Sequence, residues 1–247
     1  MSETVASGPT IGFQRWRDLS FLHWRLEAPL VRRHLPPGVD LDLFDGSAWV
    51  SVVPFAVEDG RPVGVPAGSG LDFLEANVRT YVRVDGEPGI WFFSLDASSR
   101  AAVAIARTAF GLPYRFATMR SIGSGRIHDY EVERRSGSFP RLRLRYEVGD
   151  ALGPAAPGSL EHFLLERYAL FTKHLGLLLR VRVRHEPYLP HDAFPVLKEE
   201  GLLAAAGLAR PSDAPIAHYQ PVLAVDFLPP TIVTAGERAR RVRTAAA

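Results

Sequence analysis

The segment Phe73–Val84 alternates strictly in character, and this alternation constrains the fold more than any other feature of the chain. Alternation with period two is typical of a β-strand, because successive side chains point to opposite faces of the sheet. One face would carry Leu74, Ala76, Val78, Val82 and Val84, and the other Glu75, Asn77, Arg79, Tyr81 and Arg83. The polar face admits two interpretations, a solvent-facing surface of alternating charge or the polar lining of a barrel interior. The neighbouring run Ile90–Leu95 is apolar or aromatic on both faces, which adds weight to the second.

Other short runs of the same kind are joined by turns. Asp45–Gly46 lies between Val39–Leu43 and Ser47–Val57, and a DG pair in that position indicates a hairpin. Further strands are predicted at Tyr114–Ile122, Arg126–Arg134, Leu142–Val148, Leu177–His185 and Ala217–Phe227. Helices are predicted at Glu27–Leu35, at Ser98–Ala109, at Leu160–Leu175 with Gly176 as its end, and as a short piece within Lys198–Ala206. Glu58–Gly70 and Gly149–Gly158 are predicted to be loops. Because hairpins rather than regular helices link the strands, we expect an antiparallel α+β fold of about eight to ten strands.

Length and composition indicate a single globular unit. A chain of 247 residues fits one large domain or two small ones, and no linker divides it. We therefore expect one domain over residues 1–228 and a flexible, Ala-rich tail over residues 229–247. The tail carries Arg238, Arg240, Arg241 and Arg243, a cluster typical of a solvated terminus rather than of a nucleic-acid site.

Several classes of protein are excluded or disfavoured at this stage. The absence of cysteine excludes disulfides and thiolate catalysis. No apolar run approaches the ~20 residues that span a bilayer, and Met1–Thr10 lacks the features of a signal peptide, so we expect a cytoplasmic protein. His185 and His191 do not have the spacing of a zinc site, and no cofactor motif is present, so we expect neither a metal nor a cofactor.

The stretch Phe110–Arg115 places reactive groups at a corner. Gly111 can end the preceding helix in the left-handed conformation, and Pro113 prevents its continuation. Tyr114 and Arg115 would then stand where the next strand begins. A phenol and a guanidinium cannot form a Schiff base, and the chain's two lysines, Lys173 and Lys198, lie elsewhere.

The predicted helix Leu160–Leu175 has features with more than one interpretation. Glu166 and Arg167 can be surface residues, or they can point from an apolar helix into a pocket. The apolar stripe of the same helix could serve an interface between copies of the chain, so a homo-oligomer is possible. That stripe comprises Leu160, Phe163, Leu164, Tyr168, Phe171 and Leu175.

Four ordered motifs resemble those of the YqjF-like DUF2071 family of uncharacterised proteins, a branch of the acetoacetate decarboxylase-like superfamily. They are Glu75–Val82, Trp91–Asp96, Phe110–Tyr114 and Ser159–Tyr168. The resemblance covers about Phe13 to Phe227 and implies a cone-shaped, mostly antiparallel closed β-barrel with a few flanking helices and an internal pocket.

The resemblance also implies a set of site residues. The superfamily's decarboxylases use a Schiff-base lysine next to a second lysine, which lowers the pKa of the first. Acetoacetate decarboxylase is the known example of this effect. Tyr114 and Arg115 stand at those two positions. A catalytic glutamate falls on Glu75, an arginine near Arg17, and a second acidic residue is replaced near Ser51.

We therefore expect a small-molecule pocket protein, a lyase-like enzyme without a Schiff base, acting on a small oxo-acid or related anionic metabolite. Glu75 would act as general base, Tyr114 would donate a hydrogen bond to an oxyanion, and Arg115 would hold the substrate's anion at the same centre. Arg17, Arg79 and Tyr81 are predicted to bind the substrate. The alternative is a barrel that binds or senses a ligand without turnover, having lost the nucleophile. Neither a nucleic acid nor a membrane is expected as a partner.

Overall fold

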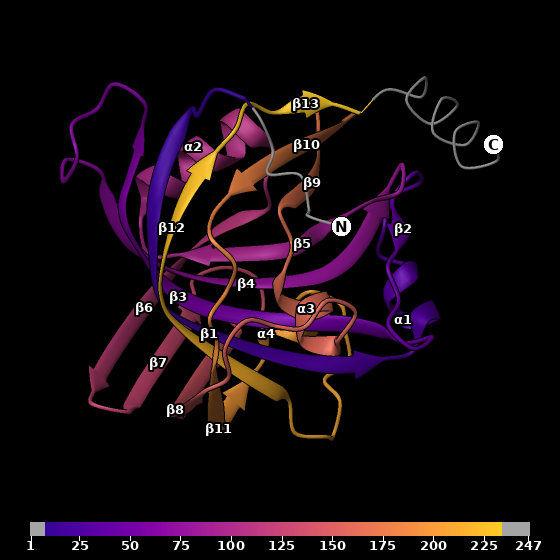
Figure 1. Cartoon of the computed structure of the whole chain (residues 1–247), viewed down its shortest axis with the longest axis vertical. Coiled ribbons are helices and arrows are strands. Elements are labelled where there is room, and N and C mark those ends of the chain that lie inside the picture. The colour runs from indigo at the N-terminus through magenta and orange to yellow at the C-terminus, as the bar shows by residue number, and fades with distance from the viewer. Residues whose placement is uncertain (1–7, 234–247) are drawn as a thin grey trace.

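The computed structural model describes residues 8–233, which form one mostly antiparallel sheet with short helices against it (Figure 1). The strands are β1 Gly12–Leu26, β2 Asp40–Leu41, β3 Ala48–Pro62, β4 Leu71–Val84, β5 Glu87–Ala97, β6 Tyr114–Ser124, β7 Ile127–Arg134, β8 Arg141–Ala151, β9 Ala169–His174, β10 Leu177–Arg184, β11 His191–Glu200, β12 Ile216–Phe227 and β13 Thr231–Ile232. The helices are α1 Ala28–Arg32, α2 Arg100–Phe110, α3 Leu160–Leu165 and α4 Leu202–Ala205.

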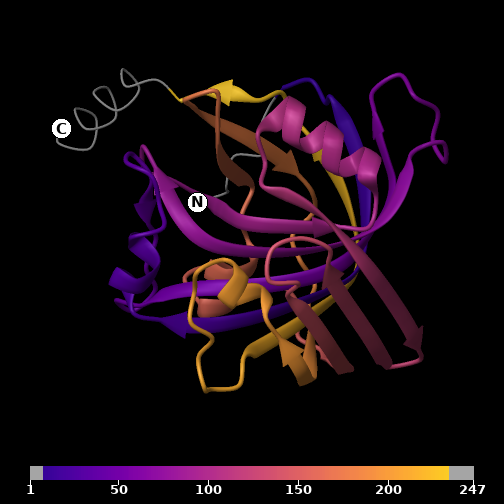
Figure 2. The ribbon, with the colours of Figure 1, turned by 180° about the vertical axis from the view of Figure 1, so that it is seen from behind.

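The sheet returns on itself through its pairings. Its order is β13-β10-β9-β5-β6-β7-β8-β11-β12-β1-β3-β4-β2, and the further pairings β4–β5 and β10–β12 join strands that are distant in this order. Strand β5 pairs in parallel with β6 and β9, whereas the other pairings are antiparallel. In both views α2 lies at one end of the molecule, with the tips of β6, β7, β8 and β11 toward the other (Figures 1 and 2). The predicted mostly-strand α+β class is confirmed.

Strand β4 separates two apolar cores. Phe73 and Tyr81 face one core, and Ala76 and Val78 face the other, which also contains Tyr130. This division follows from the alternation in the sequence. The predicted polar face is buried at Glu75, Asn77, Arg79 and Tyr81, and exposed only at Arg83. The interior interpretation of that face is therefore the right one.

The corner between α2 and β6 forms as the sequence predicts. Helix α2 begins after Ser99, whose side chain accepts a hydrogen bond from the amide of Ala102, and ends at Gly111 with φ of 65°. A Cβ atom at Gly111 would also lie 2.5 Å from Nδ1 of His174, so the position requires glycine on two grounds. Tyr114 then starts β6 and pairs with Leu95 of β5.

The predicted helix Leu160–Leu175 is wrong beyond Leu165. Helix α3 ends there, and Ala169–His174 is strand β9, whose first four residues are buried in the sheet. Leu175 and Gly176 both have positive φ and form a two-residue hairpin to β10, so Gly176 serves a strand turn rather than a helix end. A short apolar run does not distinguish a buried strand from a helix by periodicity alone. Leu164 and Phe171 of the predicted stripe are buried, whereas Leu175 is exposed in the hairpin, so the stripe does not form one continuous helix face. A homo-oligomer stays a prediction.

Other boundaries differ from expectation in the same direction, toward more strand. Strand β1 was not anticipated, and β3 extends to Pro62 into the predicted loop. Lys198 lies in β11, and α4 begins only at Leu202. Strand β13 extends the sheet into the first residues of the predicted tail, whereas residues 234–247, with the arginine cluster, lie outside the described residues. No helix within residues 8–233 is long and apolar enough to cross a membrane.

Candidate functional site

A cavity of about 410 Å³ lies along the inner face of β4. Alternate residues of this strand line it, in the order Leu71, Phe73, Glu75, Asn77 and Arg79. Leu71 is 37% exposed and Arg79 only 7%, so the cavity opens near the start of β4 and ends at Arg79. At about 3.3 Å per residue, this lining is roughly 26 Å long measured along the strand.

The remaining walls are predominantly apolar. They come from strands β1, β3, β5 and β10, represented by Phe21, Phe55, Ile90, Leu95, Val181 and Val183. Ala102, Ile105, Ala106 and Ala109 of α2 also line the cavity, and Ile105 is 55% exposed, which places α2 beside the mouth. Burying an apolar ligand against such walls is favourable in proportion to the area removed from water.

Glu75 and Tyr114, which both line the cavity, form a hydrogen-bonded pair. The Tyr114 hydroxyl donates a hydrogen bond to Oε2 of Glu75 at 2.6 Å. The two side chains come from β4 and from the first residue of β6, which pair with the two edges of β5. This contact joins two of the three predicted catalytic residues.

The environment of this pair favours a base that works near neutral pH. Burial raises the pKa of Glu75 from 4.5 to about 7, the hydrogen bonds of Tyr114 and Asn77 oppose that rise, and the charge of Asp96 adds to it. Burial, and then the charge of Glu75, raise the pKa of Tyr114 well above 10, so the phenol keeps its proton. Glu75 can therefore exchange a proton in this pH range while Tyr114 acts as a hydrogen-bond donor.

Arg79 lies at the inner end of the cavity without a charged partner among residues 8–233. Its Nε has no hydrogen-bond partner, and its Nη2 reaches only the carbonyl oxygen of Leu164, at 3.5 Å. Phe21 lies under its guanidinium, 5.4 Å away. A buried guanidinium in this state is costly unless an anion reaches it.

Arg167, the next cation in the lining, differs from Arg79 because its charge is already matched. Its Nη1 contacts Oδ2 of Asp42 at 2.7 Å, and its Nε donates to the carbonyl oxygen of Phe163 at 2.8 Å. Asp42 also binds Arg83 through its other oxygen. The remaining buried carboxylate nearby, Glu166, accepts hydrogen bonds from the amide of Tyr188 and the hydroxyl of Tyr168.

Tyr81 does not line the cavity, although we predicted that it binds the substrate. It is fully buried, and its hydroxyl contacts Oγ of Ser51 at 2.7 Å and the carbonyl oxygen of Leu164 at 3.0 Å. Ser51 contacts Nδ1 of His23 at 2.7 Å in turn. The Tyr81 ring lies against both guanidinium groups, 5.9 Å from that of Arg79 and 5.4 Å from that of Arg167. Tyr81 thus supports the wall behind the arginines.

The prediction that Arg115 shares the cavity with Tyr114 is wrong. Adjacent residues of a strand point to opposite faces, so the inward Tyr114 leaves Arg115 on the exposed side. Arg115 is not among the residues that line the cavity. The corner therefore supplies one side chain to the site rather than two.

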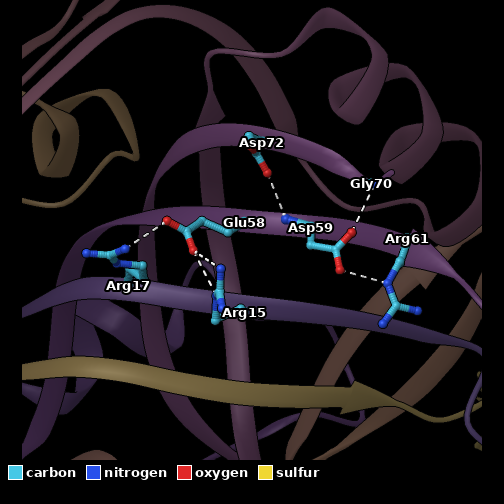
Figure 3. A network of polar contacts seen from close by, with 7 residues as sticks. All are labelled: Arg15, Arg17, Glu58, Asp59, Arg61, Gly70 and Asp72. Atoms are coloured by element: carbon cyan, nitrogen blue, oxygen red, sulfur yellow. Dashed lines mark hydrogen bonds and ion pairs between the residues drawn. The ribbon is translucent and has the colours of Figure 1, made fainter. Parts of the chain in front are cut away.

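Arg17 also lies outside, for the same reason. Trp16 of β1 lines the cavity, and its neighbour Arg17 is half exposed and contacts Oε1 of Glu58 at 3.2 Å. Arg15 contacts the other oxygen of Glu58 at 2.7 Å (Figure 3). The predicted role of Arg17 in binding the anion is contradicted by this position. Arg79, two alternations inward of Glu75, occupies the place where that role can be filled.

The sequence leaves Arg167 between a surface and a pocket position, and the structure places it in the lining. Tyr188, also in the lining, is not predicted to belong to the site. Tyr188 lies in a Pro-rich stretch and contacts Phe21 edge to face, which no sequence pattern indicated. Its place depends on the tertiary fold alone.

The described part of the lining contains no lysine. Lys173 of β9 is exposed beside a separate hollow, and Lys198 is on β11. Within residues 8–233 no group of three or more His, Asp or Glu side chains is arranged to hold a metal ion.

The fold is similar to the acetoacetate decarboxylase-like fold of solved structures. The enduracididine biosynthesis enzyme MppR superposes with a TM-score of 0.63 at 12% identity, over 94% of this chain and 91% of that one. Acetoacetate decarboxylase from Legionella pneumophila superposes with a TM-score of 0.62 at 14% identity, over 93% and 90%. MppR structures include complexes with pyruvate and with the condensation product of pyruvate and imidazole 4-carboxaldehyde.

The chain belongs to the DUF2071 family, described as an uncharacterised conserved protein, whose model matches residues 13–224. It is 36% identical over 227 residues to the uncharacterised protein YqjF of Bacillus subtilis, covering 92% of this chain and 94% of that protein. The family resemblance seen in the sequence is thereby confirmed.

Proposed function

We propose that the protein is a lyase-like enzyme that moves a proton on an anionic carbonyl compound, such as an oxo-acid, without forming a Schiff base. The observation that carries this proposal is the hydrogen-bonded pair of Glu75 and Tyr114 in an apolar cavity. In this proposal the returning sheet acts as a closed, cone-shaped barrel that keeps water from the pair.

The chemistry follows from the two side chains. Glu75 as carboxylate takes a proton from the carbon next to the substrate's carbonyl. The electron pair of the broken C–H bond forms a carbon–carbon double bond, and the π pair of the carbonyl moves onto its oxygen. Tyr114 turns its hydroxyl to that oxygen and stabilises the enolate by a hydrogen bond. Glu75 then returns the proton to carbon as the carbonyl re-forms. Alternatively it gives the proton to a leaving group on the next carbon, whose bond breaks as the carbonyl re-forms and the two carbons become joined by a double bond. Arg79 holds the substrate's anionic group.

The structural relatives support this direction of chemistry without fixing the substrate. MppR binds pyruvate and a condensation product of pyruvate, which are oxo-acid compounds. The cavity here has an acid–base pair and a cation, yet no lysine among its described lining residues. A step that needs only proton transfer and enolate stabilisation is consistent with that set.

The experiment is deuterium exchange by NMR in D₂O on a panel of oxo-acids, from 2-oxo and 3-oxo acids to longer acids whose carbonyl lies further from the carboxylate. Borohydride treatment and mass spectrometry follow. We expect enzyme-dependent exchange at the carbon next to the carbonyl and no borohydride adduct on the protein. A lysine adduct would contradict the proposal, and so would exchange no faster than in buffer for every acid tested.

Replacing Tyr114 by Phe should shift the titration of Glu75 upward. Tyr114 lowers the pKa of Glu75 through its hydrogen bond, so without it that pKa rises above its present value of about 7. In the pH profile of exchange, the ascending limb of Tyr114→Phe should move to higher pH and its plateau should fall. Tyr130→Phe is a matched control, because the Tyr130 hydroxyl bonds the carbonyl oxygens of Phe55 and Glu75 and not the carboxylate. An unchanged limb in Tyr114→Phe would contradict the assignment.

A second function, ligand binding without turnover, is favoured by one specific observation. Among the described residues the lining is mostly apolar and contains one arginine, Arg79, without a charged partner. This lining suits retention of an anion as well as its conversion. Thermal shift with the same acids would separate the two functions. Stabilisation by acids that undergo no exchange would favour the binding protein.

A further inference from the structure

The cavity extends well beyond its reactive pair on both sides along β4. Glu75 is about 13 Å from Arg79 and about 13 Å from Leu71 at the mouth, measured along the strand at 3.3 Å per residue. A ligand anchored at Arg79 must therefore pass Asn77 before it reaches Glu75, and continues past Phe73 before it leaves the protein. A three- or four-carbon acid is too short to occupy this path.

The polarity of the path is also graded. The inner end is cationic, because Arg79 has no charged partner in the described chain while Arg167 is paired with Asp42. The outer half, beyond Glu75, is bounded mainly by apolar side chains such as Phe73 and Ile105. The cation at that end, Arg61, is paired with Asp59 at 2.8 Å. A volume of about 410 Å³ lies within the range of pockets that enclose drug-sized molecules.

We infer that the natural ligand is an elongated amphipathic carboxylic acid, with its carboxylate on Arg79 and an apolar chain or ring system that runs outward beneath α2. The inference rests on the proposed function in that it assigns the same cavity, and it names the substrate class. The reactive carbonyl would lie partway along the molecule, beside Glu75 and Tyr114, rather than next to the carboxylate.

The unpaired charge of Arg79 requires that the group bound to it be an anion rather than a neutral polar group. Arg79 is more than nine-tenths buried, and its Nε has no hydrogen-bond partner among residues 8–233. The buried carboxylates Asp42 and Glu166 are already engaged by other groups. A carboxylate from the ligand would supply the missing acceptor in bidentate geometry.

The test is a titration series with straight-chain saturated carboxylates, from butanoate to dodecanoate, by isothermal titration calorimetry at about pH 6. At this pH the probe is ionised, whereas Glu75, with a pKa of about 7, is mostly protonated and does not repel it. We expect affinity to rise about fourfold per added methylene, until the chain reaches the mouth. An affinity independent of chain length would overturn the inference.

Two variants locate the head group. Arg79→Met should weaken the carboxylates by about 10- to 100-fold and leave the corresponding primary alcohols unchanged. Arg17→Met is the matched control, because Arg17 is half exposed on the outer face. This substitution should change neither the affinity for the carboxylates nor that for the alcohols. Equal weakening of acids and alcohols in Arg79→Met would contradict the placement of the carboxylate.

A third variant keeps the inference testable if Arg79→Met fails to fold. Ala106→Phe on α2 should weaken dodecanoate and leave butanoate unchanged, because only the longer chain reaches that part of the cavity. An equal loss of affinity for dodecanoate and butanoate would overturn the proposal that the apolar chain runs outward beneath α2.

The proposed function and this inference fail in different ways. Chain-length-dependent binding without any proton exchange would leave the ligand class standing and remove the enzyme. Exchange on short oxo-acids without chain-length dependence would do the reverse.

Discussion

Replacing Glu75 by Gln should reduce proton exchange on the active oxo-acid by about 10²- to 10⁴-fold, the usual contribution of a positioned general base. Gln preserves the volume and can still accept the hydrogen bond that Tyr114 donates at 2.6 Å, but it cannot take a proton. The wild-type rate should rise with pH through about 7, as the Glu75 carboxylate forms, and the residual rate of the variant should not. The exchange rates of the wild type and of the variant can be measured by quenching the reaction at set times, at pH values from about 5 to about 9.

The same variant should be more stable than the wild type at high pH. The pKa of Glu75 is about 7 in the folded protein against an ordinary value of 4.5, so the folded state binds more protons between these values. The stability associated with the protonated carboxyl is complete below 4.5 and is lost as the pH rises through about 7. This difference between the two pKa values corresponds to a loss of about 3 kcal/mol in the free energy of unfolding at high pH. The Glu75→Gln variant has no carboxylate and does not incur this loss.

Urea denaturation of both proteins near pH 5 and pH 8.5 tests this expectation. The advantage of Glu75→Gln should grow with pH, and a stable but inactive variant would show that the rate is lost through chemistry and not through unfolding. Glu58→Gln provides the matched control, because Glu58 lies on the outer face with Arg15 and Arg17. A Glu75→Gln variant that keeps the wild-type exchange rate would remove Glu75 as the base.

Local patterns predicted those parts of the site that depend on one strand or one corner. The alternation of β4 placed Glu75, Asn77 and Arg79 on one face, and the Gly111 and Pro113 signals placed Tyr114 at the start of β6. These features need only the period of a strand and the end of a helix.

The remaining parts were not predictable from such patterns. Arg115 and Arg17 were assigned by their place in a motif, and each lies one residue from an inward side chain, where the strand period reverses the direction. Arg167 follows α3, whose end after Leu165 is imposed by the sheet that takes up Ala169–His174. Tyr188 reaches the cavity only because distant segments pack together.

Replacing Arg134 by Met should destabilise the protein by about 3 to 5 kcal/mol. Arg134 of β7 contacts both oxygens of Asp96 at 2.7 Å and Oγ of Ser94 at 3.1 Å, and the side chains of the ion pair are 5% and 0% exposed. The variant leaves Asp96 as a buried carboxylate without its cation. Arg145→Met is a matched control, because Arg145 forms a surface pair with Asp129 that should contribute at most about 1 kcal/mol.

Replacing both members of the pair, as Arg134→Met with Asp96→Leu, should recover most of that loss, because no uncompensated charge remains. Urea denaturation of the single and double variants measures the coupling. The double variant should also lower the pKa of Glu75, since the charge of Asp96 contributes to its rise. The pair joins β5 and β7 on either side of β6, where Asp96 stands opposite Arg115 and Leu95 opposite Tyr114. We therefore expect the pair to hold β6, the strand that carries Tyr114, in place between β5 and β7. An Arg134→Met variant as stable as the wild type would contradict this expectation.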